Sequence, residues 1–133
     1  MVNSIYTDLD VNNLKQLIGI VDSEDNSNKC IILKFTADWC GPCKRIKDYC
    51  YKKFEKYKNS VLCFDINIDL DENMELYLAY KQKKMVTSIP TIIAYIKKSD
   101  RDSNHWWVPD LIVNSAKQTE IENFFNKIDT LVK

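Results

Sequence analysis

The sequence predicts an α/β fold, in which helices cover a β-sheet. Helical and strand patterns alternate along the chain without repeats or a linker. Residues 30–37 form a near-continuous apolar run, which is typical of a strand buried on both faces. A chain of 133 residues that is 45% hydrophobic can bury most of its apolar surface around one core. We therefore expect a single domain over residues 1–133.

The first half of the chain opens with a short apolar pair, Ile5 and Tyr6. A helix is predicted over residues 11–21, because one face collects the apolar residues Leu14, Leu17, Ile18 and Val21. The polar residues 22–29 predict a loop before the buried strand. A second helix is expected over residues 41–57, with an apolar face formed by Ile46, Cys50, Phe54 and Tyr57.

The middle of the chain continues the alternation of strand and helix. Residues 61–68 have the pattern of a strand. A helix follows and ends near residue 83, and either Asp69 or Asp71 can cap its start. Another strand is predicted over residues 91–96.

The C-terminal part predicts one irregular strand and one helix. Residues 105–113 are strand-like, but Pro109 cannot donate to a ladder, so we expect an edge strand or a bulge. Ser115 and Gln118 have the spacing of a capping box. The helix after them has a single apolar stripe, formed by Ile121, Phe124, Phe125, Ile128 and Leu131.

The charge balance favours neither a nucleic-acid nor a membrane partner. The chain has 19 basic and 19 acidic side chains, and its formal net charge is zero. Its first residues lack the pattern of a leader, and no stretch approaches the roughly 20 apolar residues of a membrane helix. Five irregularly spaced cysteines favour a reducing compartment over a secreted disulfide framework. We expect a cytoplasmic protein, and we expect it to be a monomer.

The most informative motif is Trp39-Cys40-Gly41-Pro42-Cys43, because two thiols two residues apart can exchange electrons as a disulfide. The motif opens the second helix, whose free N–H groups would stabilise a thiolate on Cys40. We predict that Cys40 is the exposed attacking sulfur and that Cys43 is shielded until it resolves the mixed disulfide. Pro42 suits a first helical turn, and Gly41 would let the backbone bend between the sulfurs.

A zinc site is the alternative interpretation of the paired cysteines. Such a site needs two further ligands, ideally a second CxxC or a CxxH pair. Here the other cysteines are single and His105 is the only histidine, so we expect no metal. Cys30, Cys50 and Cys63 fall on core positions, and Cys30 is the most exposed candidate among them because it follows a polar loop.

Residues 37–44, Ala-Asp-Trp-Cys-Gly-Pro-Cys-Lys, resemble the active-site signature of the thioredoxin family. Two distant segments add to this resemblance. Residues 89–91, Ile-Pro-Thr, match the position of the family's cis-proline, and residues 66–69, Ile-Asn-Ile-Asp, resemble its third-strand motif. The resemblance implies a thioredoxin fold, with a central mixed sheet of four to five strands flanked by about four helices.

The resemblance also implies roles for residues outside the cysteine pair. Pro90 in cis would face the disulfide, and the backbone of Ile89 would pair with an extended substrate peptide. Trp39 would shield the site and contact the substrate, although an ordinary core aromatic is the alternative. Asn114 lies near a glycine position that borders the family's substrate groove, and its side chain could narrow that groove.

The chain departs from the family at one charged pair. Lys34 lies in the buried strand where the family usually carries an acid that assists deprotonation of the second cysteine. The family's partner lysine aligns with Asp65, so the charges are exchanged. A lone buried ammonium is costly, and Lys34 therefore needs a counter-ion. Our hypothesis is a buried Lys34–Asp65 pair, with Asp65 taking part in proton transfer toward Cys43. The alternative is a surface pair that reaches solvent.

These features together predict a thioredoxin-type protein-disulfide reductase that needs no cofactor of its own. Electrons would come from a separate NADPH-dependent reductase, and the other partners would be disulfide-containing proteins. Two alternatives stay open. One is a thioredoxin-fold binding or scaffold subunit with little redox turnover. The other is a disulfide isomerase or oxidase, a class whose spacer commonly includes a histidine, which this spacer lacks.

Overall fold

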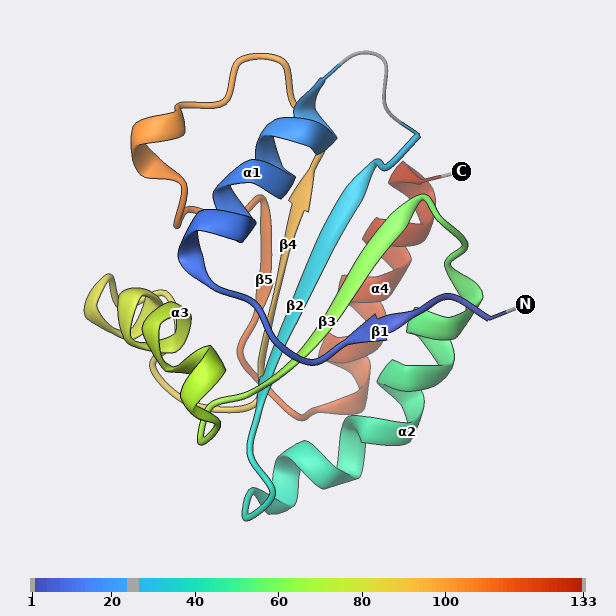
Figure 1. Ribbon diagram of the computed structural model, residues 1–133. Helices are drawn as coiled ribbons and strands as arrows, with labels where there is room; N and C mark the ends of the chain where they lie inside the picture. The colour runs from blue at the N-terminus through green and yellow to red at the C-terminus, as the bar shows by residue number, and fades with distance from the viewer. Residues whose placement is uncertain (1, 24–26, 133) are drawn as a thin grey trace.

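A computed structural model describes residues 2–23 and 27–132 and places a five-stranded sheet at the centre of the molecule (Figure 1). In spatial order the strands are β1 (Ile5–Tyr6), β3 (Val61–Asn67), β2 (Cys30–Thr36), β4 (Thr91–Ile96) and β5 (Leu111–Val113). The first three are parallel to one another, whereas β4 and β5 pair antiparallel. The expected mixed sheet is thus confirmed.

Two helices cover each face of the sheet. The helices are α1 (Val11–Asp22), α2 (Gly41–Lys56), α3 (Asp71–Gln82) and α4 (Gln118–Leu131), with a short 3₁₀ turn η1 (Ser103–His105). α1 and α3 lie on one face, and α2 and α4 lie on the other (Figure 1). The predicted helices and strands are all present, which confirms the fold class. Part of the predicted 22–29 loop, residues 24–26, lies outside the described residues.

The central strand β2 links the two cores. Alternate residues of a strand point to opposite faces, so Leu33 and Phe35 pack under α1 and α3, while Ile32 packs under α2 and α4. Every residue from Cys30 to Phe35 is buried. Because β2 leads directly into the cysteine motif, the redox pair is attached to a buried central strand of the sheet.

Two helix starts differ from the predictions. Leu70 stands at the N-cap of α3, so neither Asp69 nor Asp71 caps that helix. Lys117 is the N-cap of α4, without a side-chain cap, and the predicted capping box is wrong. The reason is local, since the Ser115 hydroxyl accepts a hydrogen bond from the Lys117 N–H in a turn before the helix.

The C-terminal region contains the other corrections. Only residues 111–113 of the predicted 105–113 strand form β5, an edge strand, and Pro109 precedes it. Trp106 and Trp107 are partly buried against the core beneath α1 and α3. Leu131 is 51% exposed and does not belong to the buried stripe of α4. No helix in the described part of the chain is long and apolar enough to span a membrane.

Candidate active site

Cys40 and Cys43 form a disulfide at the start of α2. Their Cα atoms are 5.3 Å apart, within the usual range for disulfides. Cys40 is the N-cap of the helix, and its Sγ accepts a hydrogen bond of 3.2 Å from the Cys43 backbone N–H. Pro42 occupies the first turn, where its missing N–H costs no helical hydrogen bond. The helix start thus directs an N–H donor at the first sulfur.

Gly41 is not required by the backbone. It has no positive φ, and a Cβ at this position would meet no atom within 4 Å. The use predicted for Gly41, to let the backbone bend tightly between the sulfurs, therefore has no support in its backbone angles. The space above Gly41 is open, which leaves room for a partner to approach the disulfide.

The first sulfur is more covered than the sequence suggested. Cys40 is 4% exposed and Cys43 is 1% exposed, so the prediction of an exposed Cys40 is wrong, although it is the more accessible of the two. The neighbouring Trp39 is 67% exposed, which rules out the core-aromatic alternative. Its indole Nε1–H donates a hydrogen bond of 2.8 Å to Asp69 Oδ2. Trp39 is thereby held at the surface beside the disulfide.

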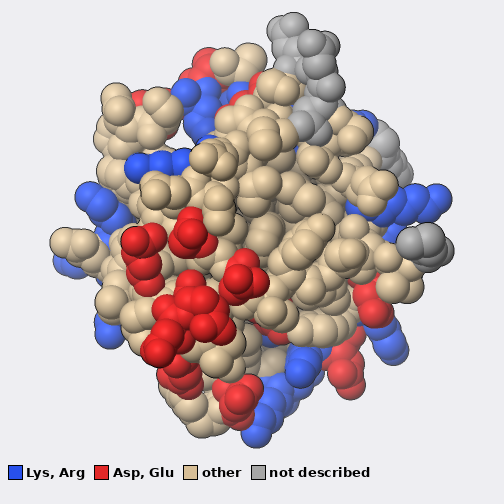
Figure 2. Space-filling view, in the orientation of Figure 1, with Lys and Arg blue, Asp and Glu red and all other residues tan. Residues whose placement is uncertain are grey.

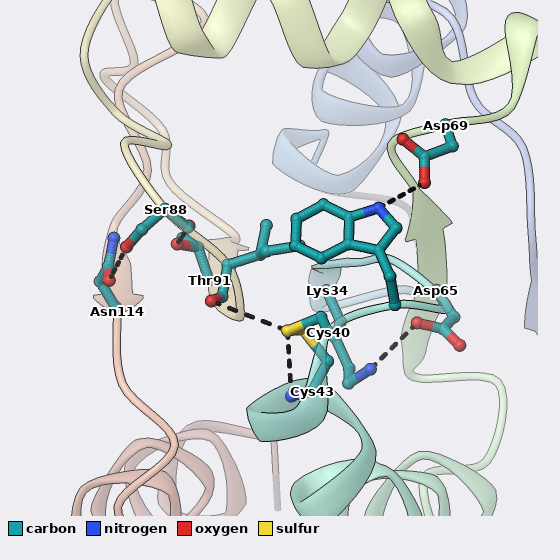
Figure 3. Close-up of a disulfide and its surroundings, with 10 residues drawn as sticks. Lys34, Cys40, Cys43, Asp65, Asp69, Ser88, Thr91 and Asn114 are labelled. Atoms are coloured by element: carbon teal, nitrogen blue, oxygen red, sulfur yellow. Dashed lines mark hydrogen bonds and ion pairs between the residues drawn. A yellow bond between two sulfur atoms is a disulfide. The ribbon is translucent and has the colours of Figure 1, made fainter.

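The segment before β4 faces the disulfide. The Ile89–Pro90 peptide bond is cis, as the resemblance implied, and the Ile89 carbonyl oxygen lies 3.9 Å from Cys40 Sγ. Thr91 Oγ1 donates to the Ser88 carbonyl at 2.6 Å. Asn114, which follows β5, accepts a hydrogen bond of 2.8 Å from the Ser88 hydroxyl (Figure 3). Asn114 therefore contacts the cis-proline segment.

Lys34 and Asp65 form a buried ion pair. They are aligned partners in the parallel β2–β3 ladder, and Lys34 Nζ lies 3.2 Å from Asp65 Oδ1 (Figure 3). Lys34 is 1% exposed and Asp65 is 9% exposed. The hypothesis of a buried pair is confirmed in its geometry, and the alternative of a surface pair is wrong. Each charge compensates the other at a site where both side chains are largely removed from solvent.

Tyr51 is a member of this cluster that the sequence analysis did not identify. Its hydroxyl donates a hydrogen bond to Asp65 Oδ2, and Lys47 Nζ lies 5.4 Å from its ring centroid. Burial, followed by the hydrogen bond to Asp65, raises the pKa of Tyr51, so the hydroxyl stays protonated and acts as a donor. Cys43, Lys47 and Tyr51 recur every four residues, a spacing that places them on one face of α2.

A cavity of about 450 Å³ connects the ion pair with the disulfide. Cys43 and Asp65 both line it, together with Thr36, Lys47 and Asn67 among others. A cavity of this size that includes such polar side chains can hold water molecules. Cys43 and the Asp65 carboxylate therefore line the same cavity, which is large enough to contain water.

The remaining cysteines do not take part in the disulfide. Cys30, Cys50 and Cys63 are free thiols and all are fully buried, which confirms the predicted core positions; Cys30 is no more exposed than the other two, so its ranking as the most exposed candidate is wrong. Burial raises the pKa of each, and that of Cys50 reaches about 12. Among the described residues there is no group of three or more His, Cys, Asp or Glu side chains that could hold a metal ion.

Comparison with known proteins places this site in a family. The family model described as Thioredoxin matches residues 19–127, which is most of the chain. The chain belongs to the thioredoxin family. Combined with the Cys40–Cys43 disulfide, this membership makes the protein a thiol-disulfide oxidoreductase of the CxxC type.

Individual relatives support this assignment. Thioredoxin 1 of Plasmodium falciparum is 35% identical over 82 residues, covering 62% of this chain and 72% of that protein. Thioredoxin 3 of the same species is 31% identical over 124 residues, covering 93% of this chain and 59% of that protein. The crystal structure of a Plasmodium falciparum thioredoxin matches with a TM-score of 0.64 at 26% identity, covering 92% of this chain and 85% of the other. Thioredoxin NaTrxh of Nicotiana alata has a TM-score of 0.65 at 23% identity, covers 100% and 96% of the two chains, and shows the same fold.

Proposed function

We propose that this thioredoxin-family protein reduces disulfide bonds in other proteins, with residues 1–133 acting as one domain. The observation that carries the proposal is the hydrogen bond from the Cys43 N–H to Cys40 Sγ at the first turn of α2. In the reduced protein the same donor and the helix dipole would stabilise negative charge on Cys40. Cys40 is accordingly the nucleophile, and Cys43 is the resolving thiol.

The first step is attack on a substrate disulfide. The Cys40 thiolate forms a bond with one substrate sulfur, and the other substrate sulfur leaves as a thiolate that takes a proton from solvent. The product is a mixed disulfide between Cys40 and the substrate. Trp39 and the Ile89 backbone border this position, which supports their predicted part in substrate binding.

The second step regenerates the internal disulfide. The Cys43 thiol loses its proton and attacks Cys40 Sγ, and the second substrate sulfur leaves as a thiolate. Two electrons have then passed to the substrate. Asp65 is our candidate for the proton acceptor, because it shares a cavity with Cys43 and is held in place by Lys34 and Tyr51.

The oxidised protein needs an external source of electrons. The two cysteines carry the electrons both when the substrate is reduced and when the protein itself is reduced again, so we propose that it needs no bound cofactor. We propose a separate NADPH-dependent reductase as the electron donor. The partners are this reductase-like donor and disulfide-containing proteins. A cytoplasmic location and a monomeric state stay predictions.

Reduction of insulin disulfides by dithiothreitol, followed as turbidity, tests the reductase activity. We expect the wild-type protein to accelerate the reaction and Cys40→Ser to abolish the acceleration. Equal activity in Cys40→Ser would overturn the role of the cysteine pair and favour the scaffold alternative. Cys63→Ala is the matched control, since this thiol is buried away from the disulfide.

The equilibrium of the Cys40–Cys43 pair with a glutathione buffer separates a reductase from an oxidase. A reductase should have a reduction potential more negative than about −230 mV, whereas the reduction potential of a strong oxidant lies at about −120 mV. The absence of histidine between the cysteines supports the reducing value.

The pH profile of substrate reduction tests the proton-transfer role of Asp65. Asp65→Asn keeps the size of the side chain and its ability to accept from Tyr51 but removes its capacity as a base and the negative charge that pairs with Lys34. We expect the rate of the second step to fall by about tenfold or more and its pH dependence to change. An unchanged profile would show that Cys43 loses its proton by another route.

A further inference from the structure

An open groove of about 440 Å³ lies between the cis-proline segment and the start of α4, next to the disulfide. Its part next to the cysteines is apolar and is formed by Pro42, Ile89 and Pro90. Its other residues include two cations, Arg45 and Lys117. The groove adjoins the redox site, because the carbonyl oxygen of its lining residue Ile89 lies 3.9 Å from Cys40 Sγ.

The two cations are exposed and have no ion pair with any described residue. Arg45 lies two residues after Cys43 on α2, and Lys117 is the N-cap of α4. The acids closest to these cations in the sequence are Asp48, which follows Arg45 on α2, and Glu120, which follows Lys117. Glu120 lines a neighbouring hollow. Neither acid forms a salt bridge with Arg45 or Lys117. Both positive charges are therefore available to a bound partner.

The end of the groove is shaped before any partner binds. The Ser88 hydroxyl donates to Asn114 Oδ1 at 2.8 Å, and Asn114 Nδ2 lies 3.5 Å from Thr87 Oγ1. These contacts join the residue after β5 to the cis-proline segment. A preformed polar wall reduces the ordering that binding would require.

The side of the disulfide away from the groove carries several acidic side chains. Trp39 is bonded to Asp69 there, and Figure 3 shows Asp69 and Asn114 on opposite sides of the sulfur atoms. Figure 2 shows acidic side chains gathered over α3 and the segment that leads into α1. The exposed acids of these segments are Asp8, Asp10, Asp71, Glu72 and Glu75. A substrate with one charged flank would therefore meet attraction in one orientation and repulsion in the other.

We propose that the groove selects protein substrates that carry an acidic side chain beside the disulfide-bonded cysteine, on the flank that lies over Arg45 and Lys117. The inference rests on the proposed reductase function and adds a substrate class to it. The apolar floor accommodates the extended backbone and small side chains next to the cysteine, while the two cations bind the carboxylate.

A set of short peptides provides the test. Each peptide has one cysteine in a mixed disulfide with a chromophoric thiol, and carries Glu, Gln or Lys two residues before or two residues after that cysteine. The rate constant for reduction by the reduced protein is measured for each peptide at low and at high salt. We expect Glu to react faster than Gln by about 3- to 10-fold on one flank only, Lys to react more slowly, and added salt to diminish the difference.

Two variants identify the groove as the source of the preference. In Arg45→Gln/Lys117→Gln the ratio of the Glu rate to the Gln rate should fall close to one. In the matched control Lys52→Gln/Lys127→Gln, which removes two exposed lysines outside this groove, the ratio should persist. Circular dichroism confirms that both variants are folded.

The outcomes separate the groove from the reductase function. Equal rates for Glu, Gln and Lys peptides would overturn the proposed selectivity while leaving the reductase function intact. A preference for Glu that survives in Arg45→Gln/Lys117→Gln would place recognition elsewhere and also overturn it. If none of the peptides were reduced, the proposed reductase function would itself fail.

Discussion

Lys34 Nζ lies 3.2 Å from Asp65 Oδ1 across the two central parallel strands, and this pair is buried behind the redox disulfide. The carboxylate is bonded on its other oxygen by Tyr51. Asp65 is thus satisfied on both oxygens and adjoins the cavity that Cys43 lines. The ion pair has the charge order opposite to that expected from the family resemblance.

Exchanging the two charges tests whether the pair acts as a unit. Lys34→Asp alone would place two carboxylates side by side, and we expect it to lower the free energy of unfolding by about 3 to 5 kcal/mol. Lys34→Asp/Asp65→Lys should recover most of that loss, because the opposite charges are restored. Urea unfolding of the oxidised proteins measures both values. A double variant that is no more stable than Lys34→Asp would contradict the coupling between the two residues.

Removing the Tyr51 hydroxyl should weaken the same cluster. Tyr51→Phe keeps the ring but leaves Asp65 Oδ2 without its donor, and we expect a loss of about 1 to 2 kcal/mol in the free energy of unfolding. Tyr49→Phe is the matched control on the same helix, since the Tyr49 hydroxyl has no hydrogen bond to a described residue; its loss should stay below about 0.5 kcal/mol. Equal losses in the two variants would show that the Tyr51 hydrogen bond is not a specific support of Asp65.

Arg101 lies in the loop between β4 and β5 and is expected to hold this loop to the rest of the fold. Its guanidinium donates to Asp22 and to Asp110 at 2.7 Å each, and to the Ile96 carbonyl at 2.6 Å. Arg101→Met would leave two partly buried carboxylates unpaired, so we expect urea unfolding to show a loss of about 2 to 4 kcal/mol.

The other arginine in the chain supplies the control for this prediction. Arg45 is exposed and unpaired within the described residues, so Arg45→Met should cost less than about 0.5 kcal/mol. A similar effect of the two substitutions would mean that the Arg101 contacts contribute little to stability.

The buried thiols predict a loss of stability at alkaline pH. Burial raises the pKa of Cys50 from its ordinary 9.0 to about 12, so above pH 9 the folded protein keeps a proton that the unfolded chain loses. The folded state then binds more protons, and the free energy of unfolding falls as pH rises, by up to about 1.4 kcal/mol per pH unit for one thiol. The contribution is fully present below pH 9 and is lost between 9.0 and about 12.

Urea unfolding between pH 8 and 10.5 measures this slope. The comparison uses the Cys40→Ser/Cys43→Ser background, in which no native disulfide can exchange. Adding Cys50→Ala should lower stability at pH 8 and make the decline above pH 9 shallower. If the free energy of unfolding declined equally with pH with and without Cys50, the raised pKa of Cys50 in the folded protein would be contradicted.

Much of the site could be predicted because it depends on local patterns. The apolar run of β2 and the helical spacing of α2 placed Cys40 at a strand-to-helix junction. A buried ammonium in the middle of a strand requires a counter-ion on a neighbouring strand, and the family resemblance pointed to Asp65 as that partner of Lys34. In both cases the physical requirement acts within one element or between adjacent strands.

Features that depend on distant packing could not be predicted. The family resemblance implied that the cis-proline segment faces the disulfide, but not that this segment, 49 residues further along the chain, covers Cys40 with the Ile89 carbonyl. Tyr51 reaches Asp65 only because α2 lies over β3, and the three partners of Arg101 come from three separate parts of the chain. The α4 start was misassigned because the Ser115 turn resembles a capping box in sequence.

Trapping of a mixed disulfide tests the central claim, that Cys40 attacks the substrate and Cys43 resolves the product. The Cys43→Ser and Cys40→Ser variants are each mixed in reduced form with a disulfide-bonded substrate such as insulin, quenched in acid and analysed by mass spectrometry. Our account predicts that Cys43→Ser accumulates an adduct on Cys40 and that Cys40→Ser accumulates none. An adduct on Cys43 in the Cys40→Ser variant, with none on Cys40 in Cys43→Ser, would contradict it.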